Sequence, residues 1–340
     1  MSNKRIVIGL DHGNGWVKAK TDSNMVVLPS YIARKDSLGE GLTGGKLELN
    51  EFESSTHKGE VYVWGKDVVK AERPLSTYGS QNRYQQKYYK LLNQFALAKV
   101  LGNYTGDVVE ALVITGIPSQ EKGTELEKDL ESTLRGSHLV KVDGKEIIIK
   151  VTKVVIVPQP VGTLMSQYLD NDGFVKEESY EEDAVAVIDV GTGTTDLDHI
   201  KELRRQTDDF DSIKIGMFDV YKKISDFVNR QNPSANATPQ KVEEQFENGS
   251  YTVSKRSKID ITGIKEDVLE TVAMDIKNSI IQRWRTWDRF DEIIITGGGA
   301  TPLGQKLKEL IGDATPIKEA QIANAEGFYK YGKFIEGASK

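Results

Sequence analysis

The 340-residue chain contains no cysteine and only four histidines. Without cysteine it forms neither disulfide bonds nor thiolate metal sites, and a cytoplasmic location is the natural expectation. The histidines lack the spacing of metal ligands, so we expect them to be surface or core residues. They are His12, His57, His138 and His199.

Long hydrophobic runs are also absent. No apolar stretch approaches the roughly 20 residues that a membrane-spanning helix requires. The apolar stretch near the N-terminus is too short for a signal peptide, and Asp11 interrupts it. We therefore expect no interaction with a membrane.

The chain has no excess of positive charge. It has 45 Lys and Arg against 51 Asp and Glu, which gives a formal net charge of −6. Direct DNA binding depends on cationic groups that neutralise phosphates, so this balance argues against a nucleic-acid-binding face. The length allows two α/β domains with large cores.

Familiar nucleotide and nucleophile motifs are missing as well. The stretch GLTGGKL at 41–47 resembles a P-loop, but leucine follows its Gly-Lys and the first glycine is absent. The glycine-rich turns described below contain no Gly-x-Gly-x-x-Gly. No Gly-x-Ser-x-Gly elbow marks a nucleophilic serine.

Residues 6–18 read IVIGLDHGNGWVK. The β-branched run predicts a strand that ends near Asp11, and Gly13 and Gly15 predict a tight turn that permits positive φ. Such a turn exposes backbone N–H groups to an anion, and Lys18 adds a point charge for phosphate. Asp11 would repel phosphate unless a cation lay between them. For this stretch alone, an ordinary surface hairpin is the alternative.

The same pattern occurs a second time. VAVIDVGTGTTDL at 185–197 repeats Asp-x-Gly-x-Gly about 180 residues later. The segments EALVITGIPSQEKGTELEKDL from 110 and DEIIITGGGATPLGQKLKEL from 291 are related at nearly the same offset. Each has an apolar strand, Thr-Gly, a proline-containing turn and an amphipathic helix pattern. Two motif pairs at nearly one offset predict duplicated domains.

The hydrophobic periodicity predicts alternating strands and helices, and therefore mixed sheets covered on both faces. Thr238 is the expected N-cap of one helix, with Pro239 at its first position. Segments of about 30–80 and 232–262 are poorer in apolar periodicity, and we interpret them as insertions. Strands are predicted at 5–11, 16–20, 61–64, 108–115, 147–157, 184–190, 194–200 and 292–296. Helices are predicted at 83–101, 120–134, 160–169, 217–231, 239–247, 265–287, 303–311 and 320–336.

Two further junctions carry candidate chemistry. IIITGGGATPLG, from 293, feeds a buried strand into three glycines, against which a flat group can lie. A merely flexible loop is the alternative. VIVPQPVGTLM, from 155, places Gln159 between two prolines, where its amide can orient a water. A strand-to-helix turn with a locally satisfied amide is the alternative there.

Together these residues predict a phosphoryl-transfer site. Asp11 and Asp189 bind Mg²⁺ through its waters, and the hairpin N–H groups and Lys18 hold the β- and γ-phosphates. Gln159 orients the attacking water. The loop of Gly297, Gly298 and Gly299 cradles the nucleoside. The turn residues of the two hairpins are Gly13, Asn14, Gly15, Gly191, Thr192, Gly193 and Thr194.

These motifs resemble those of the actin superfamily. GLDHGNGWVK resembles its first phosphate motif, VPQPVGTLM the first connecting motif, and VIDVGTGTTDL the second phosphate motif. IIITGGGATPLG resembles the adenosine motif, and ANAEGFYKYGKF at 323–334 the second connecting helix. The motifs follow the family order over nearly the whole chain. Within the superfamily, GNGWVK, TGIPS and QPVGTL are similar to ParM-type plasmid-segregating actins.

The resemblance implies an α/β actin-like ATPase fold, with two duplicated domains around a nucleotide cleft. It implies domain I at about 1–160 plus 320–340 and domain II at 161–319, with ATP or GTP and Mg²⁺ as cofactors. ParM-type proteins form ATP-driven filaments that move plasmids through a DNA-binding adaptor on a centromere-like site. Lys241 and Glu244 carry over as adenine or ribose contacts, and a solvated charged face is their alternative.

A small-molecule kinase of the same fold is the alternative function. Such a kinase needs an acid or base on the substrate side, and none stands out in the motifs. A nucleotide site without a second substrate site therefore favours a filament-forming ATPase. Light scattering with ATP distinguishes the two functions.

Overall fold

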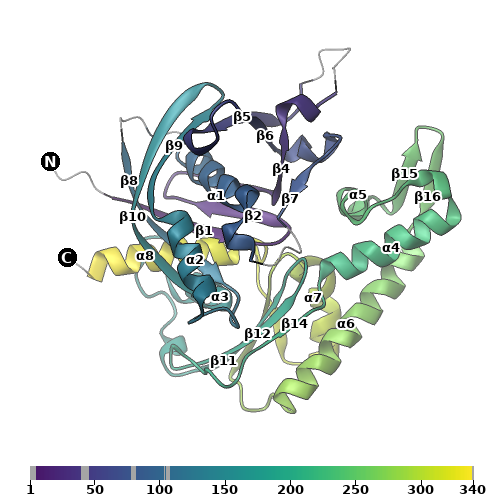
Figure 1. The fold of residues 1–340 in the computed structure, drawn as a ribbon. Coiled ribbons are helices and arrows are strands. Elements are labelled where there is room, and N and C mark those ends of the chain that lie inside the picture. Colours follow the sequence, from purple (N-terminus) through teal and green to yellow (C-terminus); the bar gives the residue numbers. More distant parts are fainter. Residues whose placement is uncertain (1–4, 40–45, 78–81, 103, 105–107, 339–340) are drawn as a thin grey trace. The chain divides into compact units, whose positions relative to one another are not determined.

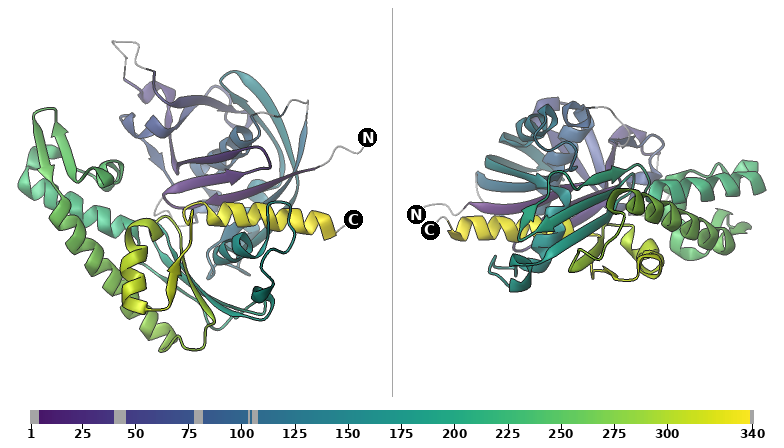
Figure 2. Two further views of the ribbon diagram at one scale, coloured as in Figure 1. Left: turned by 180° about the vertical axis from the view of Figure 1, so that it is seen from behind. Right: turned by 90° about the horizontal axis from the view of Figure 1, so that it is seen from below.

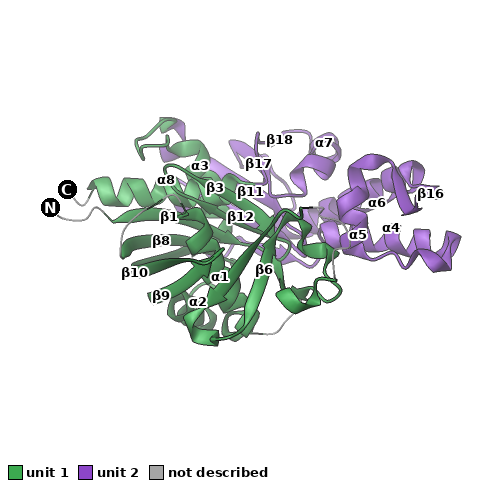
Figure 3. Ribbon diagram, turned by 90° about the horizontal axis from the view of Figure 1, so that it is seen from above, with its two compact units in different colours: residues 1–178, 322–340 green, residues 179–321 purple. Residues whose placement is uncertain are grey.

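The computed structural model describes residues 5–39, 46–77, 82–102, 104 and 108–338 (Figure 1). The P-loop-like stretch at 41–47 lies largely outside them, as do residues 40–45 and 78–81 of the first predicted insertion. The chain forms two compact units (Figure 3). Unit 1 comprises Met1–Glu178 and Ile322–Lys340, and unit 2 comprises Ser179–Gln321. The domain boundaries at 160 and 320 stay predictions.

Unit 1 is built on a ten-stranded sheet with the order β3-β2-β1-β8-β10-β9-β5-β6-β4-β7. Strands β1, β8 and β10 are mutually parallel neighbours, so their carboxyl ends share one edge. The segment predicted as an insertion at 30–80 adds β4 to β7 to this same sheet, through the pairing of β5 with β9. The strands are β1 (Ile6–His12), β2 (Trp16–Lys20), β3 (Met25–Pro29), β4 (Tyr31–Arg34), β5 (Leu49–Ser54), β6 (Val61–Gly65), β7 (Leu75–Ser76), β8 (Val109–Ile117), β9 (Gly136–Val142) and β10 (Lys145–Pro158).

The helices of unit 1 cover both faces of its sheet. Alternation along β1 sends Ile8 and Leu10 into the core shared with α1 (Lys87–Val100) and α2 (Glu125–Leu134). Val7 points to the other face, where Phe328 of α8 (Ala323–Ala338) is buried. Helix α8 lies along β1 and against α3 (Gln159–Tyr168) (Figure 2). This packing fixes the junction at which α3 begins.

Unit 2 has a six-stranded sheet with β13-β12-β11-β17-β18 in order and β14 paired to β12. Strands β11, β17 and β18 are parallel neighbours. Its strands are β11 (Ala184–Val190), β12 (Thr195–Lys201), β13 (Arg204–Arg205), β14 (Asp211–Ile213), β17 (Glu292–Thr296) and β18 (Ala314–Pro316). Its helices are α4 (Met217–Gln231), α5 (Pro239–Gln245), α6 (Thr262–Trp284) and α7 (Ala300–Ile311).

The segment predicted as an insertion at 232–262 contains α5 and a separate hairpin of β15 (Ser250–Ser254) and β16 (Ser257–Asp260). The predicted helix cap is confirmed. Thr238 is the N-cap of α5, its hydroxyl accepts the Lys241 N–H at 3.3 Å, and Pro239 is the first helical residue.

The predicted helices exist, but several ends differ. The helix predicted at 120–134 begins only at Glu125, because Thr124 caps it and accepts the Leu126 N–H at 3.2 Å. The helix predicted at 83–101 starts with a short 3₁₀ turn at Arg83–Gln85. Helix α7 begins at Ala300 rather than 303. None of the described helices is both long and apolar enough to cross a membrane.

Candidate functional site

The two glycine-rich hairpins share one local design. In hairpin 1, between β1 and β2, the Gly13 N–H donates to the Trp16 carbonyl at 3.0 Å. In hairpin 2, between β11 and β12, the Gly191 N–H donates to the Thr194 carbonyl at 2.8 Å. Each hairpin lies beside a parallel strand, β8 in unit 1 and β17 in unit 2. The repeat agrees with the duplicated architecture that the motif spacing predicts.

The first glycine of each hairpin lies close to a carbonyl oxygen and does not have a left-handed backbone. Neither Gly13 nor Gly191 has a φ in the left-handed region, contrary to the expected use of positive φ. A Cβ at Gly13 would lie 3.2 Å from the Trp16 carbonyl oxygen, and one at Gly191 would lie 3.1 Å from that of Thr194. Both contacts are tighter than most Cβ atoms make, so a side chain at either position requires the carbonyl to shift by a few tenths of an ångström.

Hairpin 1 carries an ion pair at its base. Asp11 faces Lys18 across the hairpin, and the Lys18 Nζ donates to Asp11 Oδ2 at 2.8 Å. Both residues are buried. The Gln159 Nε2 donates to Asp11 Oδ1 at 3.4 Å. Strands β1 and β10 end at one edge of the sheet, so the fold brings all three predicted residues together.

Gln159 occupies the first position of α3, directly after β10 ends at Pro158. A Cβ on the neighbouring Gly116 would lie 2.7 Å from the Gln159 Cγ. Gly116 therefore makes room for the glutamine side chain at the strand-to-helix junction. The Gln159 amide group lies beside Asp11, and it is the part of the side chain that can contact a ligand.

Hairpin 2 carries a second acid where hairpin 1 has lysine. Asp189 is paired with Asp196 across the hairpin, at the position equivalent to the pairing of Asp11 with Lys18. Asp196 is 5% exposed, and its Oδ1 has no hydrogen-bond partner. Burial, with the nearby charges of Asp189 and Asp198, raises the pKa of Asp196 to about 7. Two facing carboxyl groups with an unsatisfied oxygen favour a cation.

Sequence reasoning missed Asp196, although a signal was available. The residue stands seven positions after the motif aspartate, as Lys18 does in hairpin 1. Aligning the two hairpins would have marked it. The Thr194 hydroxyl donates to Asp196 Oδ2 at 3.3 Å, which links the turn to this acid.

Helix α4 anchors the turn of hairpin 2. The Phe218 N–H donates to the Thr192 carbonyl at 2.7 Å, and the Met217 N–H donates to the Gly191 carbonyl at 3.1 Å. A Cβ on the preceding Gly216 would lie 2.7 Å from the Thr192 carbonyl oxygen. The first turn of α4 therefore satisfies two hairpin carbonyls and holds the turn in place.

The triple-glycine loop lies against Asp189. Gly297 has a φ of +86°, and a Cβ there would lie 2.2 Å from Asp189 Oδ1. A Cβ at Gly299 would lie 2.4 Å from a Val190 side-chain carbon, whereas Gly298 has open space around it. Gly297 and Gly299 thus allow the loop to pack closely against the end of β11. Of the three glycines, only Gly298 has free space beside it for a ligand.

A polar network supports hairpin 1 from α1 and from the 3₁₀ turn that precedes it. The Arg83 Nη1 donates to Asn14 Oδ1 at 2.9 Å, and the Arg83 Nε has no hydrogen-bond partner. His12 contacts Asn93 through Nδ1 at 2.9 Å and Ser30 through Nε2 at 3.1 Å. Burial lowers the pKa of His12 to about 3, so its ring is a neutral core group. Arg83 is 69 positions from Asn14, and no local pattern could have marked it.

The two predicted nucleoside contacts lie on α5. Lys241 and Glu244 are both exposed, whereas Val242 between them is buried. The Lys241 Nζ donates to the Asn236 carbonyl at 3.5 Å. Their role in nucleotide binding stays a prediction.

The charge pattern fits a magnesium ion held mainly by water and phosphate. No group of three or more His, Asp or Glu side chains in the described part of the chain is placed to hold a metal. Mg²⁺ keeps several of its waters and is commonly bound through one or two carboxylates plus substrate phosphates. The unsatisfied Asp196 oxygen beside Asp189 suits that role. Both Asp11 oxygens already face protein donors.

Family models match both halves of the chain. The model of the N-terminal domain of actin-like proteins matches residues 9–162. The model of the C-terminal domain of archaeal MreB-like actin homologues matches residues 187–309. A search of curated proteins found no significant match.

Solved structures show the same fold over the full length. The apo ParM protein of pSK41 is 28% identical, with a TM-score of 0.77 and coverage of 99% of each chain. The archaeal actin homologue Ta0583, in complex with ADP, is 21% identical with a TM-score of 0.76, covering 98% of this chain and 99% of that one. A 15-stranded ParM filament from Clostridium botulinum is 20% identical with a TM-score of 0.77, covering 97% and 99%.

These matches confirm the predicted actin-like fold, which the paired hairpins of the two units had indicated. The chain therefore belongs to the actin superfamily, and within it the chain is similar to ParM proteins and archaeal actin homologues.

Proposed function

We propose that the chain binds ATP, or GTP, together with Mg²⁺, hydrolyses it, and forms filaments whose lifetime depends on that hydrolysis. The observation that carries the proposal is the matched pair of hairpins. One supplies a buried Lys–Asp pair and the other a buried Asp–Asp pair at the equivalent position. A polyphosphate with its cation needs both kinds of charge.

Unit 1 supplies the phosphate-binding and water-positioning groups. The Lys18 ammonium has three N–H bonds, and its bond to Asp11 leaves donors for phosphate oxygens. Asp11 keeps the Lys18 side chain ordered in the absence of nucleotide, and it contacts the ion through water. The turn residues Gly13, Asn14 and Gly15 offer backbone N–H groups beside it.

Unit 2 supplies the carboxylates for the ion. Asp189 and Asp196 hold the waters of Mg²⁺, and the turn residues Gly191, Thr192, Gly193 and Thr194 bind phosphate oxygens. When bound, Mg²⁺ offsets the negative charge of the phosphates. The open space at Gly298 receives part of the nucleoside, while Gly297 and Gly299 shape the loop. Lys241 and Glu244 on α5 contact the base or ribose.

Gln159 positions the attacking water. Its amide can accept from a water and donate to Asp11 at the same time. An uncharged amide is a poor base, so the contribution is orientation rather than proton removal. In phosphoryl transfer, orientation and electrostatics supply most of the catalysis.

The cellular role is DNA segregation through an adaptor. The pSK41 ParM protein is similar to this chain over its whole length, and a ParM protein from Clostridium botulinum forms a filament. A net charge of −6 leaves DNA contact to a separate DNA-binding adaptor on a centromere-like site.

Sedimentation tests assembly. The wild-type chain should pellet with ATP and Mg²⁺ and return to the supernatant as phosphate is released. With a non-hydrolysable analogue the pellet should persist. Asp189→Asn should not pellet in either condition while it melts near the wild-type temperature. A chain that stays monomeric at high concentration with the analogue overturns the filament proposal, and phosphorylation of a small molecule by ATP would indicate the kinase alternative.

A further inference from the structure

Unit 2 has a polar pocket at the sheet edge opposite hairpin 2. The antiparallel register places the end of β12 beside the start of β11, and the loop after α6 leads into the start of β17 there. The pocket between these segments has a volume of about 630 Å³. Its lining includes Asp208, Asp209, Arg283, Trp284, Arg285 and Arg289.

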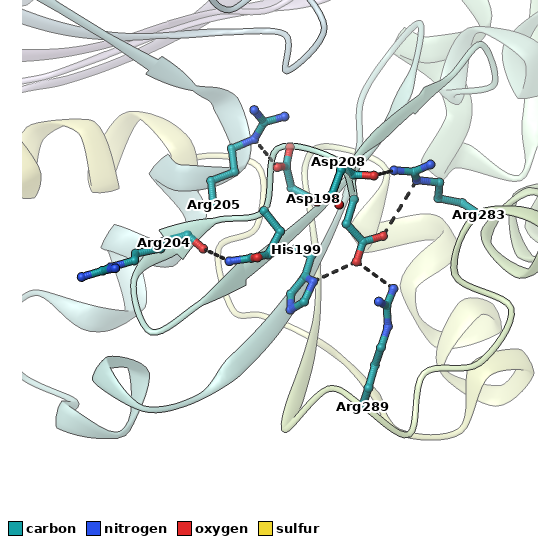
Figure 4. Close-up of polar contacts among 9 residues, drawn as sticks. Asp198, His199, Arg204, Arg205, Asp208, Arg283 and Arg289 are labelled. Atoms are coloured by element: carbon teal, nitrogen blue, oxygen red, sulfur yellow. Dashed lines mark hydrogen bonds and ion pairs between the residues drawn. The ribbon is translucent and has the colours of Figure 1, made fainter.

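Asp209 lies among three basic side chains of the pocket, those of His199, Arg283 and Arg289, which Figure 4 labels. Its Oδ2 accepts from His199 Nδ1 and from Arg289 Nη2, each at 2.8 Å, and its Oδ1 lies 3.9 Å from Arg283 Nε. Arg283 also donates to the Asp208 backbone carbonyl. The pocket is lined by three arginines and two aspartates, and no ion pair in the described part of the chain involves Arg285.

Two N–H donors of the lining residues have no acceptor. Trp284 is 3% exposed, and its Nε1 has no hydrogen-bond partner. The Arg283 Nε likewise lacks a hydrogen bond. A buried polar group without a partner destabilises the fold. Both donors belong to residues that line the pocket, which makes them candidate contacts for an acceptor bound there.

Arg285, which lines this pocket, has a strained backbone conformation. It follows the last residue of α6 with a φ of +57°, a conformation that glycine or asparagine adopts more easily. An exposed arginine there costs stability that glycine would not. Arg285 lines the pocket next to Trp284 and Thr286. A ligand contact made by the arginine is a reason to keep arginine at this strained position.

We propose that this pocket binds a small tetrahedral oxyanion of the phosphate class, at a site separate from the phosphate-binding hairpins. Guanidinium groups pair with phosphate oxygens through charge-assisted, often bidentate hydrogen bonds. The donors of three arginines, a tryptophan and a threonine all lie within residues 283–289, at the end of α6 and in the loop that follows it. A tetrahedral anion presents oxygens in several directions, whereas the two oxygens of a carboxylate lie in one plane.

Calorimetric titration with inorganic phosphate tests the proposal. Sodium chloride at matched ionic strength, acetate and sulfate serve as comparison anions. The wild-type chain should bind phosphate and sulfate more tightly than acetate. Arg285→Gln removes the positive charge that has no ion-pair partner among the described residues. Trp284→Phe removes the indole N–H donor and keeps an aromatic ring. Each should weaken phosphate binding about tenfold or more. Arg256→Gln, at an exposed position of the same unit, is the matched control and should bind as wild type.

The variants also separate this pocket from the nucleotide site. Arg285→Gln and Trp284→Phe should bind ATP with wild-type affinity, and Lys18→Ala, which lacks the lysine contact of hairpin 1, should still bind phosphate at the pocket. Absence of phosphate binding overturns the proposal. Binding that survives in both pocket variants, or that disappears in Lys18→Ala alone, places the phosphate at the hairpins and overturns it equally. Preference for acetate would indicate a carboxylate ligand instead.

Discussion

At the residue scale, the most informative group is Asp196, because it is a buried carboxyl group that faces a second one, Asp189, across hairpin 2. Its Oδ1 is buried and unsatisfied, and burial raises its pKa to about 7. A raised pKa means that the folded state binds the proton more tightly than the unfolded state. This contribution to stability is complete below the unfolded pKa near 4 and is lost as the pH rises through about 7.

Asp196→Asn should therefore stabilise the nucleotide-free chain increasingly as the pH rises. Relative to wild type, its free energy of unfolding should gain up to ~4 kcal/mol between pH 4 and pH 8, because a shift of three pKa units corresponds to about that energy. Urea unfolding at several pH values, without nucleotide or Mg²⁺, measures the difference. A difference that does not change with pH would mean that folding does not shift the pKa of Asp196.

Gln159→Ala should separate binding from hydrolysis. The side chain is uncharged and its contact with Asp11 is long, at 3.4 Å, so ATP affinity should change little. Phosphate release should fall by roughly two to three decades, because a positioned water contributes a few kcal/mol. Fluorescence titration and a phosphate-release assay measure the two effects. Gln305→Ala, at an exposed glutamine of α7, is the control. Unchanged release would move the catalytic role elsewhere, and a large loss of affinity would make Gln159 a binding residue.

At the element scale, the strand ends position the site. Asp11 and Gln159 meet because β1, β8 and β10 run in parallel, and Gly297 meets Asp189 because β11 and β17 do. The close approach leaves no space for a side chain at Gly297. The geometry of hairpin 2 therefore depends on the loop that follows β17.

Gly297→Ala should be strongly destabilising, and Gly298→Ala should not. The first change forces a Cβ to within 2.2 Å of Asp189 Oδ1 at a φ of +86°, whereas the second meets nothing within 4 Å. We expect a loss of about 2 kcal/mol or more for Gly297→Ala and less than about 0.5 kcal/mol for Gly298→Ala. Urea midpoints give both values. Equal effects would show that the loop adapts and does not constrain Asp189.

The sequence allowed prediction of the elements with clear periodicity. The β-branched runs of β1 and β11 end in glycine-rich turns, and the helices begin near caps such as Thr238. Strands β6 and β8 were predicted, whereas β4, β5, β7 and β9 were not. Strand β5 (LNEFES) carries two glutamates and β9 (GSHLVKV) begins with small and polar residues, so neither shows a clear period-two alternation and this end of the sheet was interpreted as an insertion. Asp196 could have been found from the repeat, whereas Arg83 needed the tertiary fold.

At the scale of the whole molecule, charge sets how the chain meets DNA. The net charge of −6 offers little counterion release, so the purified chain should not bind naked DNA tightly. Electrophoretic mobility shifts at low and moderate salt test this, with and without ATP. A tight shift that weakens steeply with salt would contradict the need for an adaptor.

The most direct test of the central claim is calorimetric titration of ATP, with and without Mg²⁺, into the wild-type chain and two variants. Lys18→Ala should weaken ATP binding about tenfold or more in both conditions, because a phosphate contact is lost. Asp189→Asn should bind metal-free ATP at least as well as wild type and should lose the enhancement by Mg²⁺. That result would assign the two hairpins to phosphate and ion as their charges suggest. Wild-type Mg²⁺·ATP affinity in both variants would contradict a nucleotide site built from these hairpins.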